Sequence, residues 1–115
     1  GVEMNTNRKF IERGRKGYTK EDLWCFDNWL SSLIAKGLLE FKKNCHGYPN
    51  DIDDWDKWMA TLDEMIDCFE EQGRGIENLT DNNFVSHHKK RMAIKKAKLH
   101  RGLELLERYW FDLWD

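Results

Sequence analysis

The chain has 115 residues, of which 40% are hydrophobic and 13% aromatic, and its formal net charge is −2. This length is enough for one domain with one core, and the apolar content excludes a disordered tail. One proline among many Leu, Lys, Glu and Asp residues favours an all-α fold. The sequence has neither a long apolar run typical of a membrane span nor an apolar segment typical of a signal peptide, so we expect a cytoplasmic protein without membrane contact.

Charge is distributed unevenly along the chain. Residues 1–50 carry nine Lys and Arg against six Asp and Glu, residues 51–77 carry two against ten, and residues 78–115 carry eight against five. The net charges are therefore +3, −8 and +3. An acidic middle segment lies between two basic ones.

The N-terminal segment, residues 1–18, is predicted to be a basic arm or a short helix that ends in a turn at Gly17. Its cations are Arg8, Lys9, Arg13, Arg15 and Lys16. We expect this segment to be solvated, and the alternative is an arm that meets an anionic partner.

The remaining residues, 19–115, are predicted to form one helical domain with three principal helices in an antiparallel bundle. Thr19 is a suitable N-cap for the first helix, which ends at Lys42 and Lys43. Its predicted inner stripe is Leu23, Phe26, Leu30, Leu33, Gly37 and Phe41, widened by Trp29, Ile34 and Leu38. A loop follows, with Gly47 and Pro49 as helix breakers.

The second helix is acidic, and we expect Asp51 or Asp53 to cap it and Gly73 to end it. Its predicted inner stripe is Ile52, Trp55, Met59, Leu62, Met65 or Ile66, and Phe69. A linker of turn-forming residues follows over 73–83.

The third helix, over 84–114, is predicted to be the element against which the other helices pack. Apolar spacing of three and four residues defines its inner stripe: Val85, His88, Met92, Lys96, Leu99, Leu103, Leu106, Trp110 and Leu113. Gly102 lies inside this pattern, where it disfavours a helix by about 1 kcal/mol relative to Ala. We therefore expect a neighbouring helix or aromatic ring to approach Gly102 closely.

The first half of this third helix carries seven Lys and Arg over residues 87–101 and no acid. We expect pairing with the acidic second helix, or solvation, to account for most of this charge. The alternatives are an anionic ligand or protein partner that contacts Lys89, Lys90 and Arg91, and, ranked below it, direct binding of nucleic acid. The acidic helix could instead mimic phosphates toward a nucleic-acid-binding protein.

Two further groups of residues are candidates for binding. His46 and Tyr48 could line a pocket for an anionic ligand together with Arg15, Lys16 and Tyr18. Because a long helix separates the two groups, that pocket requires an oligomer. At the C-terminus, Tyr109, Phe111 and Trp114 lie at helical angles away from the predicted seam, so we expect them to mediate self-association as a homodimer.

We find no motif of a catalytic site, such as a nucleophile elbow, a phosphate-binding glycine loop or a zinc-protease helix, and we predict no enzyme activity and no cofactor. The three cysteines, Cys25, Cys45 and Cys68, are expected to be buried free thiols. A zinc site at Cys45 and His46 lacks two further ligands at usable spacing, so no metal is expected.

Several pieces of the sequence resemble a family of small helical proteins encoded by bacteriophages and prophages. These pieces are Arg15-Lys16-Gly17-Tyr18-Thr19, Asp22 with Trp24, His46-Gly47-Tyr48-Pro49, the helix 55–69, and Gly102 with the ending 109–115. The resemblance covers most of residues 15–115 and transfers no functional residue. It implies a phage accessory protein in a bacterial cytoplasm, of a type that often blocks a host factor or sequesters a signalling nucleotide.

Three functional hypotheses follow in order. The first is a non-enzymatic binding protein that antagonises a host bacterial protein, such as one of a defence system. The second is an oligomer that captures an anionic nucleotide, and the third is a small phage regulator that binds nucleic acid.

Overall fold

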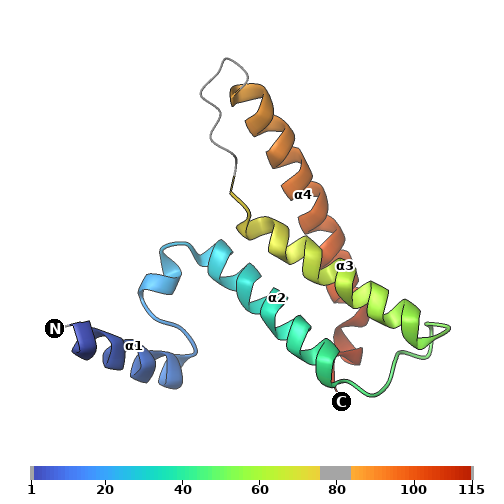
Figure 1. The fold of residues 1–115 in the computed structure, drawn as a ribbon, viewed down its shortest axis with the longest axis horizontal. Helices are drawn as coiled ribbons and strands as arrows, with labels where there is room; N and C mark the ends of the chain where they lie inside the picture. Colours follow the sequence, from blue (N-terminus) through green and yellow to red (C-terminus); the bar gives the residue numbers. More distant parts are fainter. Residues whose placement is uncertain (1, 76–83, 115) are drawn as a thin grey trace. The chain divides into compact units, whose positions relative to one another are not determined.

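The computed structural model describes residues 2–75 and 84–114, except for the side chains of residues 2–6 and 84 (Figure 1). The described part of the chain is helical and contains no strand, which confirms the all-α class. The elements are α1 (Val2–Lys16), the 3-10 helix η1 (Glu21–Leu23), α2 (Phe26–Asn44), α3 (Trp55–Gly73), α4 (Phe84–Tyr109) and the 3-10 helix η2 (Trp110–Asp112). Within the described ranges there are thus four α-helices, and a three-helix antiparallel bundle remains a prediction. Most of the predicted 73–83 linker lies outside these ranges.

The chain divides into two compact units, Gly1–Leu30 and Ser31–Asp115. In the first unit, the N-terminal segment forms α1, the second of the two predicted alternatives. It ends at Gly17, whose φ of +84° is a conformation that glycine adopts without strain. Thr19 is buried and exchanges hydrogen bonds with Asp22, because each backbone N–H donates to the other side chain. These bonds tie Thr19 to η1, which begins at Glu21, so Thr19 does not cap the long helix α2, which begins only at Phe26.

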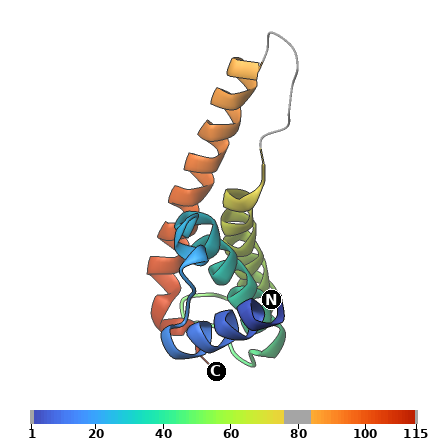
Figure 2. The same cartoon turned by 90° about the vertical axis from the view of Figure 1, so that its left-hand side faces the viewer.

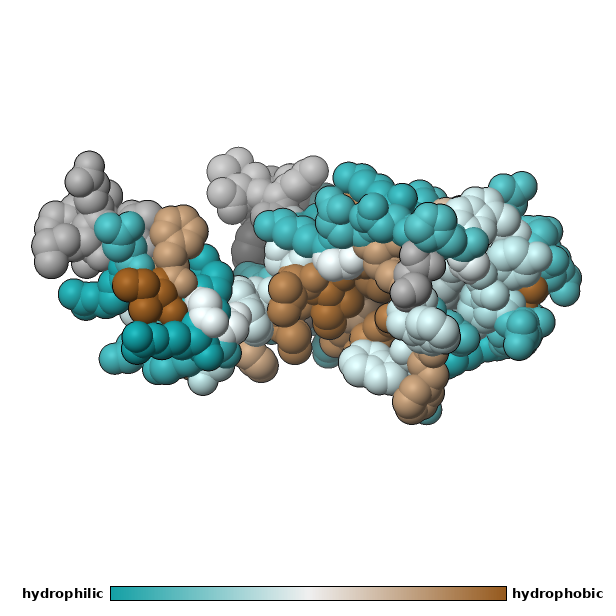
Figure 3. Space-filling model, turned by 90° about the horizontal axis from the view of Figure 1, so that it is seen from below, coloured by the Kyte–Doolittle hydropathy of each residue, from teal (hydrophilic) through white to brown (hydrophobic). Residues whose placement is uncertain are grey.

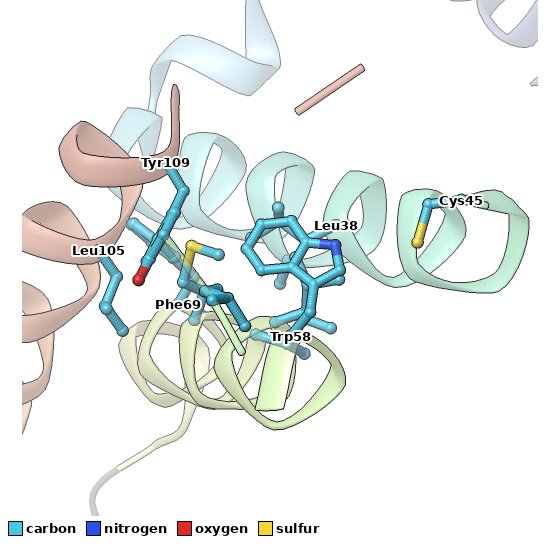
Figure 4. Packing of buried hydrophobic residues seen from close by; sticks show 11 residues of the cluster. Leu38, Cys45, Trp58, Phe69, Leu105 and Tyr109 are labelled. Carbon is cyan, nitrogen blue, oxygen red and sulfur yellow. The ribbon is translucent and has the colours of Figure 1, made fainter. Parts of the chain in front are cut away.

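The core of the second unit is built around α3. Figure 4 shows Trp58 and Phe69 of α3 meeting Leu38 of α2 and Leu105 and Tyr109 of α4. The Trp58 and Tyr109 rings pack edge to face with centroids 5.3 Å apart, a favourable aromatic geometry. The expectation that the last helix is the central element is wrong, because α3 carries the most completely buried side chains of this core: Trp58, Leu62 and Met65.

The ends of α3 follow from local hydrogen bonding. Asp54 is the N-cap, and its side chain accepts a hydrogen bond of 2.8 Å from the backbone N–H of Lys57. The predicted caps, Asp51 and Asp53, are wrong by three residues and by one residue. The helix ends at Gly73, as predicted.

Helix α4 ends at Tyr109 rather than continuing to residue 114, and its inner face is not the predicted one. Three residues of the predicted stripe, Met92, Leu99 and Leu103, are 36%, 38% and 49% exposed. The buried residues of α4 are Lys95, Gly102, Leu105 and Tyr109. The buried face is therefore rotated by about one residue, or 100°, from the apolar stripe.

Helix α2 shows the same kind of rotation. Its buried residues are Ser31, Ala35 and Leu38, whereas Leu33 of the predicted stripe is exposed. Figure 3 shows apolar side chains gathered on the lower face of the molecule, where α2 lies in Figure 1. Ala35 and Leu38 of α2 belong to the core around α3, whereas Leu30, Leu33 and Leu39 remain exposed.

Gly102 explains how α4 approaches α3. A Cβ atom at this position would lie 2.9 Å from Cβ of Cys68 and 3.2 Å from Cε2 of Phe69. Both distances are shorter than ordinary van der Waals contact, so only glycine fits. The expectation that a neighbouring helix and an aromatic ring approach Gly102 is confirmed.

The first half of α4 extends beyond the end of α3, as both ribbon views show (Figures 1 and 2). The described side chains from Val85 to Lys90 are exposed. None of the helices in the described ranges combines the length and the apolar character needed to cross a membrane.

Candidate functional site

Ion pairs join the acidic face of α3 to the basic face of α4. Nζ of Lys98 lies 2.8 Å from a carboxylate oxygen of Asp67. Further along the two helices, a guanidinium nitrogen of Arg101 lies 3.0 Å from Glu64. The interpretation that the acidic helix neutralises much of the basic run is therefore confirmed for these pairs. Because the groups are largely exposed to solvent, which screens the charges, each pair contributes little to stability.

Glu71 is the charged residue at the centre of this contact, and its side chain is buried. One carboxylate oxygen accepts a hydrogen bond from Arg74, and the other lies 2.7 Å from Nη2 of Arg91. Burial opposes ionisation of Glu71, but the hydrogen bond from Arg74 and the positive charges of Arg91, Arg74 and Lys98 outweigh it. The pKa of Glu71 is consequently lowered below its ordinary value, and the carboxylate stays ionised.

Lys95 is buried beside Glu71 and closes the C-terminal end of α3. Its ammonium group donates hydrogen bonds to the backbone carbonyls of Glu71, at 2.6 Å, and of Arg74. The side chain of Gln72 in turn donates to the carbonyl of Lys95 at 2.9 Å. Burial lowers the pKa of Lys95, and the nearby Glu71 opposes that shift. These bonds satisfy carbonyls that a helix end leaves without partners, so the role of Lys95 is structural.

The three cations proposed to contact an anionic partner differ in their exposure to solvent. Lys89 and Lys90 are exposed on the first half of α4, whereas Arg91 is half-buried against Glu71. A phosphate-binding surface on α4 therefore has fewer available charges than the sequence indicates.

The other predicted anion-binding residues fall in both units of the chain. In the first unit, Lys16 lies 3.9 Å from Glu12, and the Tyr18 ring packs edge to face against Trp29 with centroids 6.5 Å apart. Arg15 is exposed on α1. In the second unit, His46 and Tyr48 are exposed in the loop after α2. A pocket shared by these two groups remains a prediction.

The loop after α2 and the C-terminal segment together form a pocket of about 220 Å³ in the second unit. Its lining residues are Gly47, Tyr48, Pro49, Asp112 and Trp114. Two of the stretches that carry the family resemblance, far apart in the sequence, are therefore neighbours in space. The lining has aromatic rings and one carboxylate and includes neither Lys nor Arg, which suits an apolar or basic group better than a phosphate.

Two aromatic side chains, Tyr48 and Trp114, line this pocket, and Phe111 directly precedes the lining residue Asp112 in η2. Phe111 and Trp114 are 86% and 77% exposed, and Tyr48 is also exposed. We refer to Tyr48, Phe111 and Trp114 as the aromatic surface. Sequence reasoning singled out all three residues, but it assigned them to two separate sites.

The third residue predicted for self-association, Tyr109, is not at the surface. It is 6% exposed and packs on Trp58, whereas Trp110, which was predicted to be core, is 58% exposed. The prediction for Tyr109 is wrong because α4 is rotated by about one residue from the predicted seam.

A second open pocket, of about 320 Å³, lies between α2 and α3 within the second unit. It is lined by Ser31, Ser32, Ala35, Lys36, Phe69, Glu70, Gly73 and Arg74. Arg74 already pairs with Asp67 and Glu71, and Glu70 adds a negative charge. Lys36 is the other cation of this lining, and with Glu70 in the same lining the pocket does not favour an anion.

The described part of the chain shows no further candidate site among its cysteines or its metal-ligating residues. Cys45 and Cys68 are buried free thiols, as expected, while Cys25 is exposed. Burial raises the pKa of Cys68, which keeps this thiol protonated and unreactive. No group of three His, Cys, Asp or Glu residues in these ranges is placed to hold a metal ion.

Comparison of the chain with protein-family models, with curated proteins and with solved structures finds no match.

Proposed function

We propose that this protein is a non-enzymatic binding protein that acts by contacting another protein through its aromatic surface. The observation that carries this proposal is that exposed Tyr48 and Trp114 line the pocket with Asp112, and that exposed Phe111 is the neighbour of Asp112 in η2. Singly exposed apolar side chains are common on proteins, but clustered aromatic rings beside a pocket are typical of interaction sites. Tyr and Trp contribute a large share of the binding energy at protein interfaces.

The partner is proposed to be a host bacterial protein, and the context to be a phage accessory protein that antagonises it. This part rests on the resemblance to small phage proteins. The carboxylate of Asp112 in the pocket favours a partner that presents an apolar or basic side chain. It disfavours the second hypothesis, a captured anionic nucleotide, at this position.

Site-specific photocrosslinking in bacterial cells tests this proposal. A photoreactive amino acid at position 111 should capture one defined protein, whereas the same group at Ala97, an exposed position on α4, should not. Equal capture at both positions would show that the contact is non-specific.

The captured protein is then purified, and its affinity is measured for the wild type and for Phe111→Ala with Trp114→Ala. We expect the affinity to fall at least about tenfold, because two exposed rings are removed from the interface. The control is Val85→Ala, which shortens an exposed apolar side chain on α4. An unchanged affinity of the double variant contradicts the proposal.

A further inference from the structure

The apolar stripe of α4 that the core leaves exposed forms a surface of its own. We call Met92, Leu99, Leu103 and Leu106 the outer stripe. The first three are exposed, and Leu106 is half-buried because it also packs against the core. Their spacing of seven, four and three residues is the pattern by which one helix packs against another in a coiled coil.

Charges along one edge of this stripe change sign between the two halves of α4. Lys89 and Lys96 are exposed in the first half, and Glu107 is exposed in the second. Lys89 and Glu107 are 18 residues apart, about five full turns, so they lie on the same flank of the helix. In an antiparallel two-fold pair this flank faces its own copy in reverse order, which places Lys opposite Glu, whereas a parallel two-fold pair sets it against the other flank of the partner and makes no such match.

We propose that α4 pairs with α4 of a second copy of this chain in antiparallel orientation, about a two-fold axis near Leu99. In this register Met92 packs on Leu106 of the partner subunit, and Lys89 lies close to Glu107 of the partner subunit. The methylene groups of Lys96 cover Leu103 of the partner subunit while its ammonium group stays in water. The contact is self-complementary in both shape and charge, as a two-fold interface requires.

The charge pattern selects a second copy as the occupant of this stripe. An unrelated acidic helix would match Lys89 and Lys96 but would meet repulsion at Glu107. Helix α4 has 26 residues and is about 39 Å long, so the paired region can run through several turns on each side of the axis. This inference rests on other residues than the aromatic surface, so either proposal can fail without the other.

Sedimentation velocity tests the interface directly. The wild type should be a dimer at tens of micromolar, and Leu99→Glu should be a monomer, because it brings two carboxylates together at the two-fold axis. The control is Ala97→Glu, which adds the same charge at another exposed position of α4 and should leave the dimer intact. A monomeric wild type, or a dimeric Leu99→Glu variant with unchanged helical circular dichroism, overturns the proposal.

A charge exchange tests the orientation without altering the apolar stripe. Lys89→Glu alone and Glu107→Lys alone should each weaken dimerisation, by about tenfold, since each creates two repulsive pairs, and the double exchange should restore it. The two residues are about 27 Å apart within one chain, so restoration has to arise between copies. Lys90→Glu, an exposed neighbour on the opposite side of α4, is the control and should have little effect. Failure of the double exchange to restore the dimer contradicts antiparallel pairing.

Spin labels provide a second readout of orientation. With Cys25→Ser as background, a label at position 89 should lie about 30 Å along the helix axis from its copy in an antiparallel pair. In a parallel pair the same two positions would be about 10 Å apart. The short distance overturns the proposal.

Discussion

Helices α3 and α4 are both amphipathic, but they use their apolar residues in opposite ways. Helix α3 buries its apolar side chains, including Trp58, Leu62 and Met65. Helix α4 turns a face with charged residues and Gly102 toward α3 and leaves much of its apolar stripe exposed. Apolar residues spaced three and four apart therefore predict that a helix forms. Which side of that helix is buried depends on the side chains and backbone groups that the neighbouring helix presents.

The physical reason lies in what α3 presents to α4. The acidic side chains Glu64, Asp67 and Glu71 and the carbonyls at the end of α3 provide partners for the cations of α4. Gly102 then allows the two backbones to come close over Cys68 and Phe69. A leucine stripe could not satisfy these polar groups, and leaving them buried without partners would cost more than the apolar contact gains.

Truncation of one leucine in each helix gives the largest expected difference. Leu62→Ala should lower the free energy of unfolding by about 2–5 kcal/mol, because Leu62 is fully buried and its loss leaves a cavity. Leu103→Ala, at a half-exposed position, should lower it by about 1 kcal/mol or less in the monomer. Urea unfolding at low protein concentration measures both. Equal losses would show that Leu103 is also a core residue, as the sequence pattern alone predicts.

A methyl group at the helix contact gives the next largest effect. Gly102→Ala should destabilise the protein by about 1–3 kcal/mol, since the new Cβ would overlap Cys68 and Phe69. The matched control is Gly37→Ala, which has open space around it within α2 and should be neutral or stabilising by up to about 1 kcal/mol. Thermal melts should therefore show a lower midpoint for Gly102→Ala and an unchanged or higher midpoint for Gly37→Ala. A stabilised Gly102→Ala variant would show that α3 and α4 are not this close.

Low pH should weaken the ion pairs that the carboxylates of α3 make with their cationic partners. The pKa of Glu71 is lowered from its ordinary value of 4.5, so its contribution to stability is fully present above that value. This contribution is lost as the pH falls through the lowered folded-state pKa. The pKa of Asp67 is also lowered, mainly by hydrogen bonds from Lys98 and Arg74, and acts in the same direction.

Urea unfolding at a series of pH values between 7 and 3 measures this effect. Glu71→Gln should reduce the acid-dependent loss of stability, and Glu70→Gln, at an exposed position of the same helix, should reduce it less. Identical pH profiles for the two variants would exclude a special role of Glu71.

The smallest effect is expected for the affinity of the protein for nucleic acid. Because Arg91, Lys98 and Arg101 are engaged with α3, binding of duplex DNA should be weak at physiological salt. Lys89→Ala with Lys90→Ala should change this weak binding little, as measured by fluorescence anisotropy over a range of salt concentrations. Tight binding that these two substitutions abolish would favour the third functional hypothesis.

The sequence predicts α3 well because its signals agree. A strong apolar stripe, acidic residues near its start and Gly73 at its end all indicate the same helix. The capping residue was missed because Asp51, Asp53 and Asp54 are all good N-caps, and only the backbone geometry distinguishes them.

The inner face of α4 could not be predicted from its own pattern. Lysine is among the residues least often buried, so nothing in the sequence marks Lys95 as an inner residue. Its burial depends on carbonyls at the end of another helix, more than 20 residues away. Gly102 was the one signal for the correct face, since a glycine inside a helix indicates a close neighbour.

The pocket beneath the aromatic surface also could not be predicted from the sequence alone. The sequence identifies Tyr48 and Trp114 as notable residues, but their proximity depends on how α3 and α4 pack between them. The predicted anion pocket was inferred from residue type alone, by joining His46 and Tyr48 to Arg15, Lys16 and Tyr18. Residue type carries no information about the distance between side chains.

The face that α4 presents to α3 is tested most directly by a nuclear Overhauser experiment on the isotope-labelled protein. We predict strong cross-peaks between the Hα protons of Gly102 and the ring protons of Phe69, and no cross-peaks between the methyl groups of Leu103 and that ring. Cross-peaks from Leu103 or Leu99 to Phe69, with none from Gly102, would place the apolar stripe in the core and contradict this account.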